Sequence, residues 1–155
     1  MLKKVLLALL ALAVLGGGYL WLNRDRFVED FNRQRAEEVR RFHAAGIEYG
    51  RNHDQQACLD KALTDFDTQC TGFECTVRYG QFLKACLDNA SVAPAFCQEV
   101  PAFNEELTEE DKNWARQSCW GRDIRGEGCR LLMRQQQLFC SSDAAAAPGS
   151  LSAGQ

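Results

Sequence analysis

The stretch CLDKALTDFDTQCTGFECTVRYGQFLKAC, residues 58–86, decides the fold of this chain. Three turns of an α-helix take about 10.8 residues, so positions eleven apart lie within about 20° of each other around the axis. Cys75 and Cys86 therefore share one helix face. If the chain reverses near Gly72, the segments on either side form a helical hairpin with cysteines opposite one another. The pairs expected across it are Cys70 with Cys75 and Cys58 with Cys86.

A second pair of helices is expected after a proline-containing connector. Thr108 and Asp111 have the form of a capping box, in which a hydroxyl and a carboxylate bond free N–H groups at a helix start. Asp54 is suited to cap the first helix in the same way. The sequence thus predicts an all-α domain over residues 53–142, built of two antiparallel hairpins. Its four helices are expected at roughly 55–69, 73–88, 109–121 and 127–141.

The four remaining cysteines are harder to pair from their spacing. Cys119 and Cys129 flank the turn WGRDIRGEG, residues 120–128, and are expected to face each other across it. Cys97, in the connector, and Cys140 are then left for each other. Eight cysteines allow 105 pairings, so spacing alone does not select this second set.

The first hairpin is similar in layout to the twin cysteine-x9-cysteine proteins, in which nested disulfides tie two helices together. The two intervals between cysteines within this hairpin contain eleven and ten residues rather than nine. The resemblance covers only residues 58–86. It implies a stapled helical hairpin and no particular activity.

The segment VLLALLALAVLGGGYLWL, residues 5–22, contains no charged residue. As a helix it reaches about 27 Å, close to the hydrocarbon thickness of a bilayer. Tyr19 and Trp21 stand at its far end, where aromatic rings favour the membrane–water interface. We expect a single-pass transmembrane anchor that places residues 5–22 in the lipid bilayer. The alternative is a signal peptide, whose cleavage releases a secreted protein.

Cysteine usage predicts which side of the membrane holds the domain. All eight cysteines lie between Cys58 and Cys140 and lack the spacing of metal sites, which is typical of disulfide-bonded proteins in oxidising compartments. We therefore expect residues 1–4 in the cytoplasm and the domain in the periplasm, or outside a cell with one membrane. Residues 143–155 are small and low in complexity, so we expect a disordered tail.

Residues 23–52 carry apolar side chains at helical spacing within a strongly charged sequence. Phe27, Phe31 and Phe42 belong to the resulting apolar stripe. Two interpretations stay open. The stripe packs on the cysteine-rich domain, or it forms a stalk that binds a partner or a second copy of the chain.

Several chemistries are disfavoured by the sequence. Residues 52–155 hold nine basic and fifteen acidic groups, which argues against nucleic-acid binding. Metal ligands at zinc spacing and cofactor-binding or hydrolase motifs do not occur, so we expect no metal, no cofactor and no enzymatic activity. A tethered thiol–disulfide exchange or metal-handling protein is the alternative, and Cys70 with Cys75 is then the reactive pair.

We therefore expect a non-enzymatic binding or scaffolding module for another envelope protein. Trp114 and Trp120 belong either to the core, which is favoured, or to an exposed binding face. The oligomeric state is not specified by the sequence. The residues expected to contact a partner are Phe27, Phe31, Phe42 and Trp114.

Overall fold

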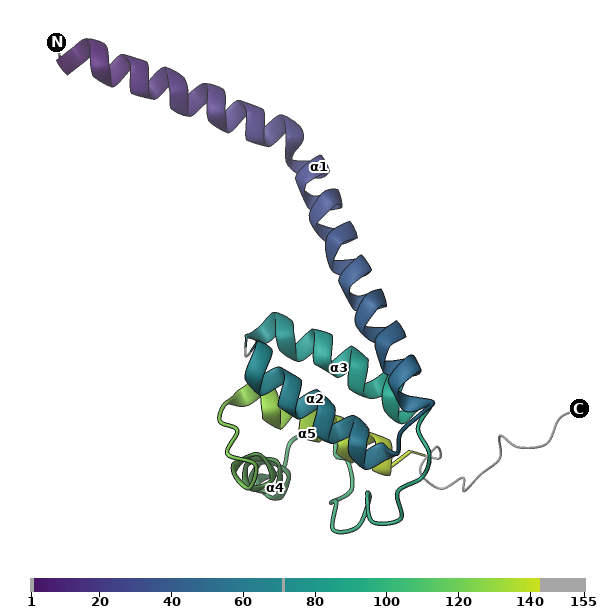
Figure 1. The fold of residues 1–155 in the computed structure, drawn as a ribbon. Helices are drawn as coiled ribbons and strands as arrows, with labels where there is room; N and C mark the ends of the chain where they lie inside the picture. The colour runs from purple at the N-terminus through teal and green to yellow at the C-terminus, as the bar shows by residue number, and fades with distance from the viewer. Residues whose placement is uncertain (1, 71, 143–155) are drawn as a thin grey trace, which may run out of the picture. The chain divides into compact units, whose positions relative to one another are not determined.

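The computed structural model describes residues 2–70 and 72–142, without the side chains of residues 2, 4, 7 and 8. Within this range the chain is all-α, as predicted (Figure 1). It has five helices and four disulfides in the described residues. The predicted tail, residues 143–155, lies outside the described residues. The helices are α1 (Leu2–Gly50), α2 (Gln55–Gln69), α3 (Phe73–Leu87), α4 (Glu109–Trp120) and α5 (Glu127–Cys140).

The chain divides into two compact units, the first ending at Glu37 and the second beginning at Glu38. In the first unit α1 leaves its apolar side chains in solvent, and those from Leu9 to Leu22 are more than half exposed. Among the described residues no helix combines the length and the apolar character needed to cross a membrane. The transmembrane anchor predicted for residues 5–22 is therefore not supported.

Local signals set the helix boundaries in the second unit. The Asp54 side chain accepts a hydrogen bond of 2.8 Å from the Ala57 N–H at the start of α2. At the start of α4, Thr108 and Asp111 form the predicted capping box. Each pairing satisfies N–H groups that lack a partner within the helix. The α3 helix begins after Gly72, and all four helices lie within one residue of their predicted ranges.

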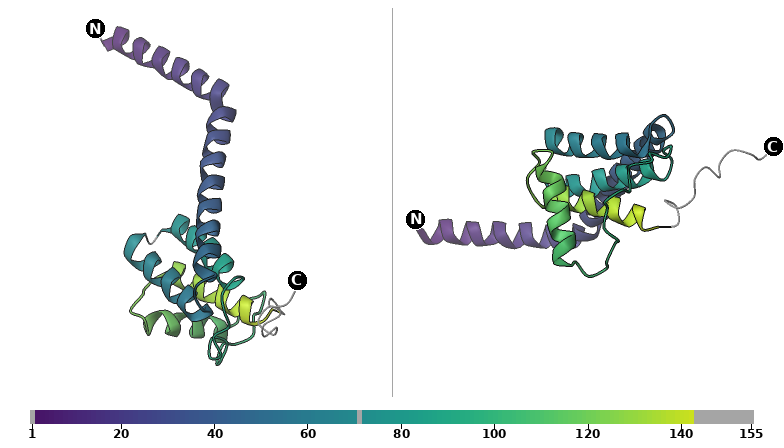
Figure 2. Two further views of the ribbon diagram at one scale, coloured as in Figure 1. Left: turned by 45° about the vertical axis from the view of Figure 1, so that its right-hand side comes forward. Right: turned by 90° about the horizontal axis from the view of Figure 1, so that it is seen from below.

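The second unit buries one apolar core between its helices. α2 packs on α3, α5 contacts both, and α4 packs on α5 (Figure 2). The bulk of the core comes from side chains at helical spacing on the inner faces of α2, α3 and α5. The largest of these fully buried side chains are Phe66, Leu59, Leu63, Leu83, Leu132 and Met133.

The last turns of α1 belong to this second unit and lie against α3. Gly46 and Gly50 are buried, and a Cβ at Gly46 would stand 2.3 Å from the Phe82 carbonyl oxygen. A Cβ at Gly50 would stand 2.4 Å from the Cys86 carbonyl oxygen. Two glycines four residues apart thus let the α1 and α3 backbones touch. The segment 23–52, predicted as a helix, is thus helical up to Gly50 as part of α1, and the boundary between the two units falls within it, after Glu37.

Four disulfides close within the second unit. The bonded Cα atoms are 5.4–6.1 Å apart, within the range usual for disulfides. Two bridges tie α2 to α3, one closes the turn between α4 and α5, and one ties the connector to the end of α5. The pairs are Cys58–Cys86, Cys70–Cys75, Cys119–Cys129 and Cys97–Cys140, the same pairs that the sequence led us to expect.

Candidate functional site

The cysteines form structural staples of differing accessibility. Cys58, Cys86 and Cys129 are fully buried, and Cys119 is nearly so. The Cys97–Cys140 bridge has both residues only half-buried, and Cys70 is also half-buried. No cysteine is free in the described part of the chain. The described residues also contain no cluster of side chains suited to hold a metal ion.

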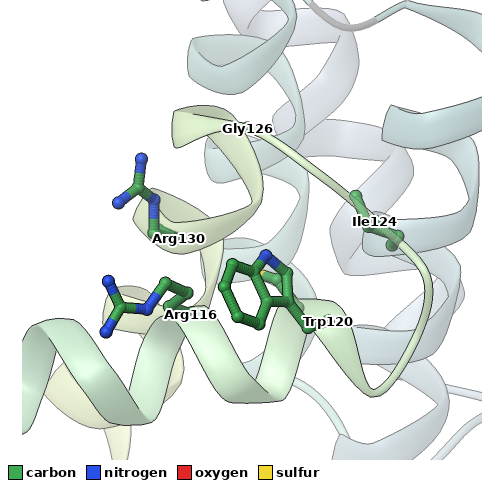
Figure 3. A pocket seen from close by; sticks show the side chains of 6 residues that line it. Arg116, Trp120, Ile124, Gly126 and Arg130 are labelled. Atoms are coloured by element: carbon green, nitrogen blue, oxygen red, sulfur yellow. The ribbon is translucent and has the colours of Figure 1, made fainter.

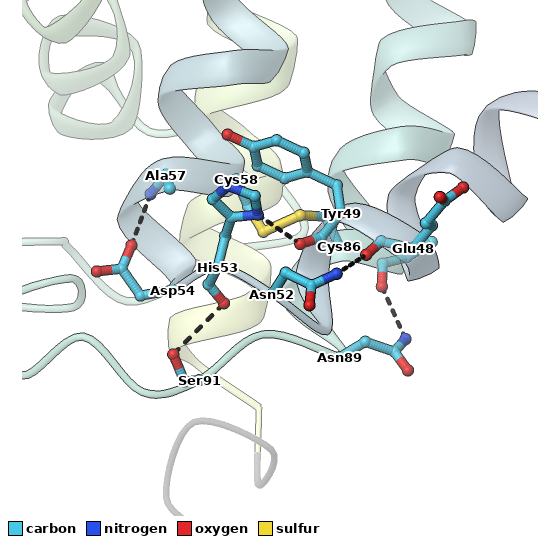
Figure 4. Close-up of a disulfide and its surroundings, with 11 residues drawn as sticks. Glu48, Tyr49, Asn52, His53, Asp54, Ala57, Cys58, Cys86, Asn89 and Ser91 are labelled. Carbon is cyan, nitrogen blue, oxygen red and sulfur yellow. Dashed lines mark hydrogen bonds between the residues drawn. A yellow bond between two sulfur atoms is a disulfide. The ribbon is translucent and has the colours of Figure 1, made fainter.

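The surroundings of Cys58–Cys86 fix the turn between α1 and α2 (Figure 4). The Tyr49 and His53 rings stack with their centroids 3.7 Å apart, and His53 Nδ1 lies 2.8 Å from the Tyr49 carbonyl oxygen. The Ser91 N–H donates to the His53 carbonyl oxygen at 3.1 Å. The disulfide therefore lies beneath a closed, hydrogen-bonded turn.

The four residues predicted to bind a partner are divided between the two units. Phe27 and Phe31 are each 53 % exposed and belong to the first unit. Phe42 packs edge-to-face on Tyr79, with ring centroids 5.3 Å apart. Trp114 packs against the core of the second unit. Phe42 and Trp114 are therefore partly covered within the fold, whereas Phe27 and Phe31 are exposed, and partner binding by the four residues stays a prediction.

The exposed tryptophan of α4 is instead Trp120, at the last position of the helix, and 49 % of its surface is exposed. It lines an open cavity of about 290 Å³ at the corner between α4 and α5. Figure 3 shows the side chains of Arg116 and Arg130 on the same side of the indole ring. The other lining residues are Cys119, Ile124 and Gly126.

Positive charge gathers around Trp120. The guanidinium carbons of Arg116 and Arg125 lie 5.5 and 5.0 Å from its ring centroid, within cation–π range. The side chain of Arg116 also donates to Asn113, a neutral partner, and Arg130 forms an ion pair with Glu127. Among the described residues, none that lines the cavity is acidic. The corner is thus cationic in an otherwise acidic domain.

The Cys119–Cys129 bridge and the backbone hold this corner in place. The N–H groups of Arg122 and Ile124 both donate to the Cys119 carbonyl oxygen at 3.0 Å. Gly126 has φ +110°, a conformation that L side chains rarely adopt, so a glycine is needed just before α5. The arginines therefore project from a frame that folding has already fixed.

A buried polar cluster joins the far ends of α4 and α5. The Asp111 carboxylate is almost fully buried and accepts hydrogen bonds from both the N–H and the hydroxyl of Thr108, at 3.0 and 2.7 Å. Gln137 donates to it at 2.7 Å and Asn104 at 3.2 Å. These donors, Thr108 above all, lower the pKa of Asp111 to about 2.

Two smaller cavities are also present. One of about 210 Å³ lies between α2 and the turn after α4, beside an ion pair of Arg122 with Asp60 at 3.0 Å. The other, about 140 Å³, lies between the ends of α3 and α5. Within the described ranges, neither joins several arginines to an exposed aromatic ring as the Trp120 corner does.

Comparisons with protein-family models, with curated proteins and with solved structures find no match to this chain. The Trp120 corner was missed in the sequence because a helical wheel does not decide which of two tryptophans is buried. A usable signal did exist. Residues 108–142 contain five arginines within a domain that is acidic elsewhere, and Arg116 stands one helical turn before Trp120.

Proposed function

We propose that this is an exported protein whose disulfide-stapled unit is a rigid, non-enzymatic binding or scaffolding module for another envelope protein. Four closed disulfides indicate an oxidising compartment outside the cytoplasm. The apolar segment of residues 5–22 serves as the targeting signal in this proposal. Rigidity favours recognition, because a preformed surface loses less conformational entropy on binding.

The observation that carries the proposal is the exposed Trp120 between arginines on a fixed corner. Tryptophan and arginine are the residue types most enriched among the side chains that dominate protein–protein binding energies. The half-exposed Trp120 indole lies next to two guanidinium groups and is not among the described residues that form or pack against the core cluster. A partner that covers it would gain both apolar contact and charge pairing.

Site-specific photocrosslinking in the native cells tests this proposal. A photoreactive phenylalanine analogue at position 120 should give adducts of discrete mass with an envelope protein. The matched control is the same analogue at Phe73, at the start of α3, which is 75 % exposed. Adducts at both positions, or at neither, would remove the basis for a binding role at this corner.

A further inference from the structure

We propose that the cavity beside Trp120 binds carboxylate groups, and that its occupant is an acidic peptide segment of the protein partner. This inference rests on the proposed binding function and adds the chemistry of the ligand. It comes from three properties of the corner: its local charge, its size and its rigidity.

Charge is the first argument. Within the described residues, the side chain of Arg116 contacts Asn113 and Trp120, and that of Arg125 contacts Trp120. Glu109, two helical turns before Arg116, has its carboxylate bonded to Lys112 at 2.7 Å. Arg130 forms an ion pair with Glu127. Lys112 and, to a lesser extent, Arg116 lower the pKa of Glu109. These two carboxylates offset part of the repulsion among the three guanidinium groups of the corner. An incoming carboxylate would relieve that repulsion, and guanidinium groups can bind it through two parallel hydrogen bonds.

Size is the second argument. At about 290 Å³ the cavity lies at the lower limit of sites that enclose small molecules, which is about 300 Å³. It is also open to solvent beside Trp120, 49 % of whose surface is exposed. These dimensions suit one or two side chains of a peptide laid across the corner. Ile124 and the indole offer apolar contact to the methylene groups of those side chains.

Charge distribution narrows the class of ligand further. The domain around the corner is acidic, with nine basic against fifteen acidic groups over residues 52–155. A long polyanion such as a nucleic acid would meet repulsion as soon as it extended beyond the cavity. A short acidic segment places its charge only where the arginines are.

Rigidity is the third argument. Cys119 lines the cavity and its bridge to Cys129 fixes the start of α5, which carries Arg130, against the end of α4, which carries Arg116. Arg116 and Arg130 therefore extend from two helices, α4 and α5, whose relative position is already fixed before a ligand binds. Such preorganisation lowers the entropic cost of capturing a small anionic group.

Isothermal titration of the full-length protein in detergent tests the inference. The probes are a blocked tetrapeptide of alternating aspartate and glutamate, its asparagine–glutamine counterpart, and inorganic phosphate. We expect the acidic peptide to bind at least about tenfold more tightly than the amide peptide, since charge-assisted hydrogen bonds exceed neutral ones by this amount or more. Binding should weaken as salt is added.

Variants locate the site. The double variant Arg116→Gln/Arg130→Gln should lose at least about tenfold in affinity for the acidic peptide. Arg122→Gln is the matched control, because Arg122 stands in the same turn but pairs with Asp60 and does not line the cavity. It should bind the peptide as the parent does. Unchanged thermal unfolding of all three proteins shows that the fold is intact.

The inference would be overturned by no binding of the acidic peptide, by equal binding of the amide peptide, or by an equal loss of affinity in Arg122→Gln. Tighter binding of phosphate than of the peptide would also overturn it, in favour of a phosphate-bearing ligand. If the titration shows no preference for the acidic peptide but position 120 still crosslinks to a partner, the carboxylate ligand is rejected and the proposed binding function is retained. Failure of both experiments rejects the proposed function itself.

Discussion

At the scale of single residues, the carboxylate of Asp111 links three parts of the second unit. It accepts hydrogen bonds from the cap of its own helix, from Gln137 on α5 and from Asn104 in the connector. All of these donors face one buried acceptor. Its charged form therefore stabilises the contact between α4 and α5.

Asp111 should make the protein sensitive to acid. Its folded pKa of about 2 lies below its ordinary value of 3.8, so the unfolded chain binds the proton more tightly. The stability contributed by the carboxylate is fully present above about pH 4 and is lost as the pH falls towards 2. Urea unfolding between pH 6 and pH 2 should show this decline.

Asp111→Asn is the informative variant for that prediction. Its NH₂ group is a hydrogen-bond donor that would face side chains which also donate, so the variant should be less stable than the parent at neutral pH. Its stability should also change less between pH 4 and pH 2, because the titrating carboxylate is gone. Glu110→Gln, an exposed position in the same turn, is the control. A pH dependence in Asp111→Asn equal to that of the parent would show that other groups govern acid unfolding.

The hydroxyl of Tyr79 supports the hairpin of α2 and α3. It donates to Gln69 at 3.1 Å, while its ring contacts Phe42 and Phe66 edge-to-face. Tyr79→Phe keeps those ring contacts and removes only the hydrogen bond. We expect a loss of about 0.5–1.5 kcal/mol in the free energy of unfolding. Gln69→Ala should lower the free energy of unfolding less in the Tyr79→Phe variant than in the parent. Equal losses in the two backgrounds would show that the Tyr79 and Gln69 side chains are not coupled.

At the scale of helices, the contact between α1 and α3 depends on two glycines. Gly46→Ala and Gly50→Ala would drive a methyl group into α3 backbone atoms, at Phe82 and Cys86 respectively. Each change should destabilise the second unit by about 1–3 kcal/mol through overpacking. Gly17→Ala is the control, since a Cβ there meets nothing within 4 Å and alanine favours a helix. Equal melting temperatures for the three variants in thermal unfolding would contradict this close approach of α1 and α3.

The helices differ in how far the sequence predicts them. The hairpin of α2 and α3 is predictable because cysteine spacing, caps and turn all specify the same register. The docking of α1 on α3 is not, because Gly46 and Gly50 show their role only once a facing backbone is known. The same holds for Trp114 and Trp120, which share a helix but meet different surroundings. Periodicity gives the buried face of a helix, whereas the packing of its ends depends on partners distant in the chain.

At the scale of the whole molecule, the disulfides should yield to a reductant in order of their burial. Attack by a thiolate requires access to a sulfur atom. Cys58–Cys86 and Cys119–Cys129 are buried, whereas Cys97–Cys140 and Cys70 are half-buried. In mild dithiothreitol without denaturant we expect Cys97–Cys140 and the bridge of Cys70 to open first. Differential alkylation with peptide mapping follows the order, and early loss of Cys58–Cys86 would contradict it.

In the proposed function, all four disulfides form because the chain is exported to an oxidising compartment. Removal of residues 1–22 should leave the second unit in the cytoplasm, where thiols are kept reduced. By the loop-entropy relation, the bridge over Cys58–Cys86 alone contributes about 3.6 kcal/mol, against about 5–15 kcal/mol for the whole stability of a domain. We therefore expect the truncated chain to react with a thiol-alkylating reagent at lysis and to be degraded, while the full chain does not react.

A matched fusion protein separates export from any other effect of the missing residues. The truncated chain joined to an unrelated cleavable signal peptide should regain protection from alkylation and accumulate like the full chain. That result would assign to residues 1–22 the task of delivering the chain to an oxidising compartment, because nothing else about the second unit has changed. Free thiols in the full chain would refute the export proposal. Oxidised thiols in the truncated chain would show that residues 1–22 are not needed to reach that compartment.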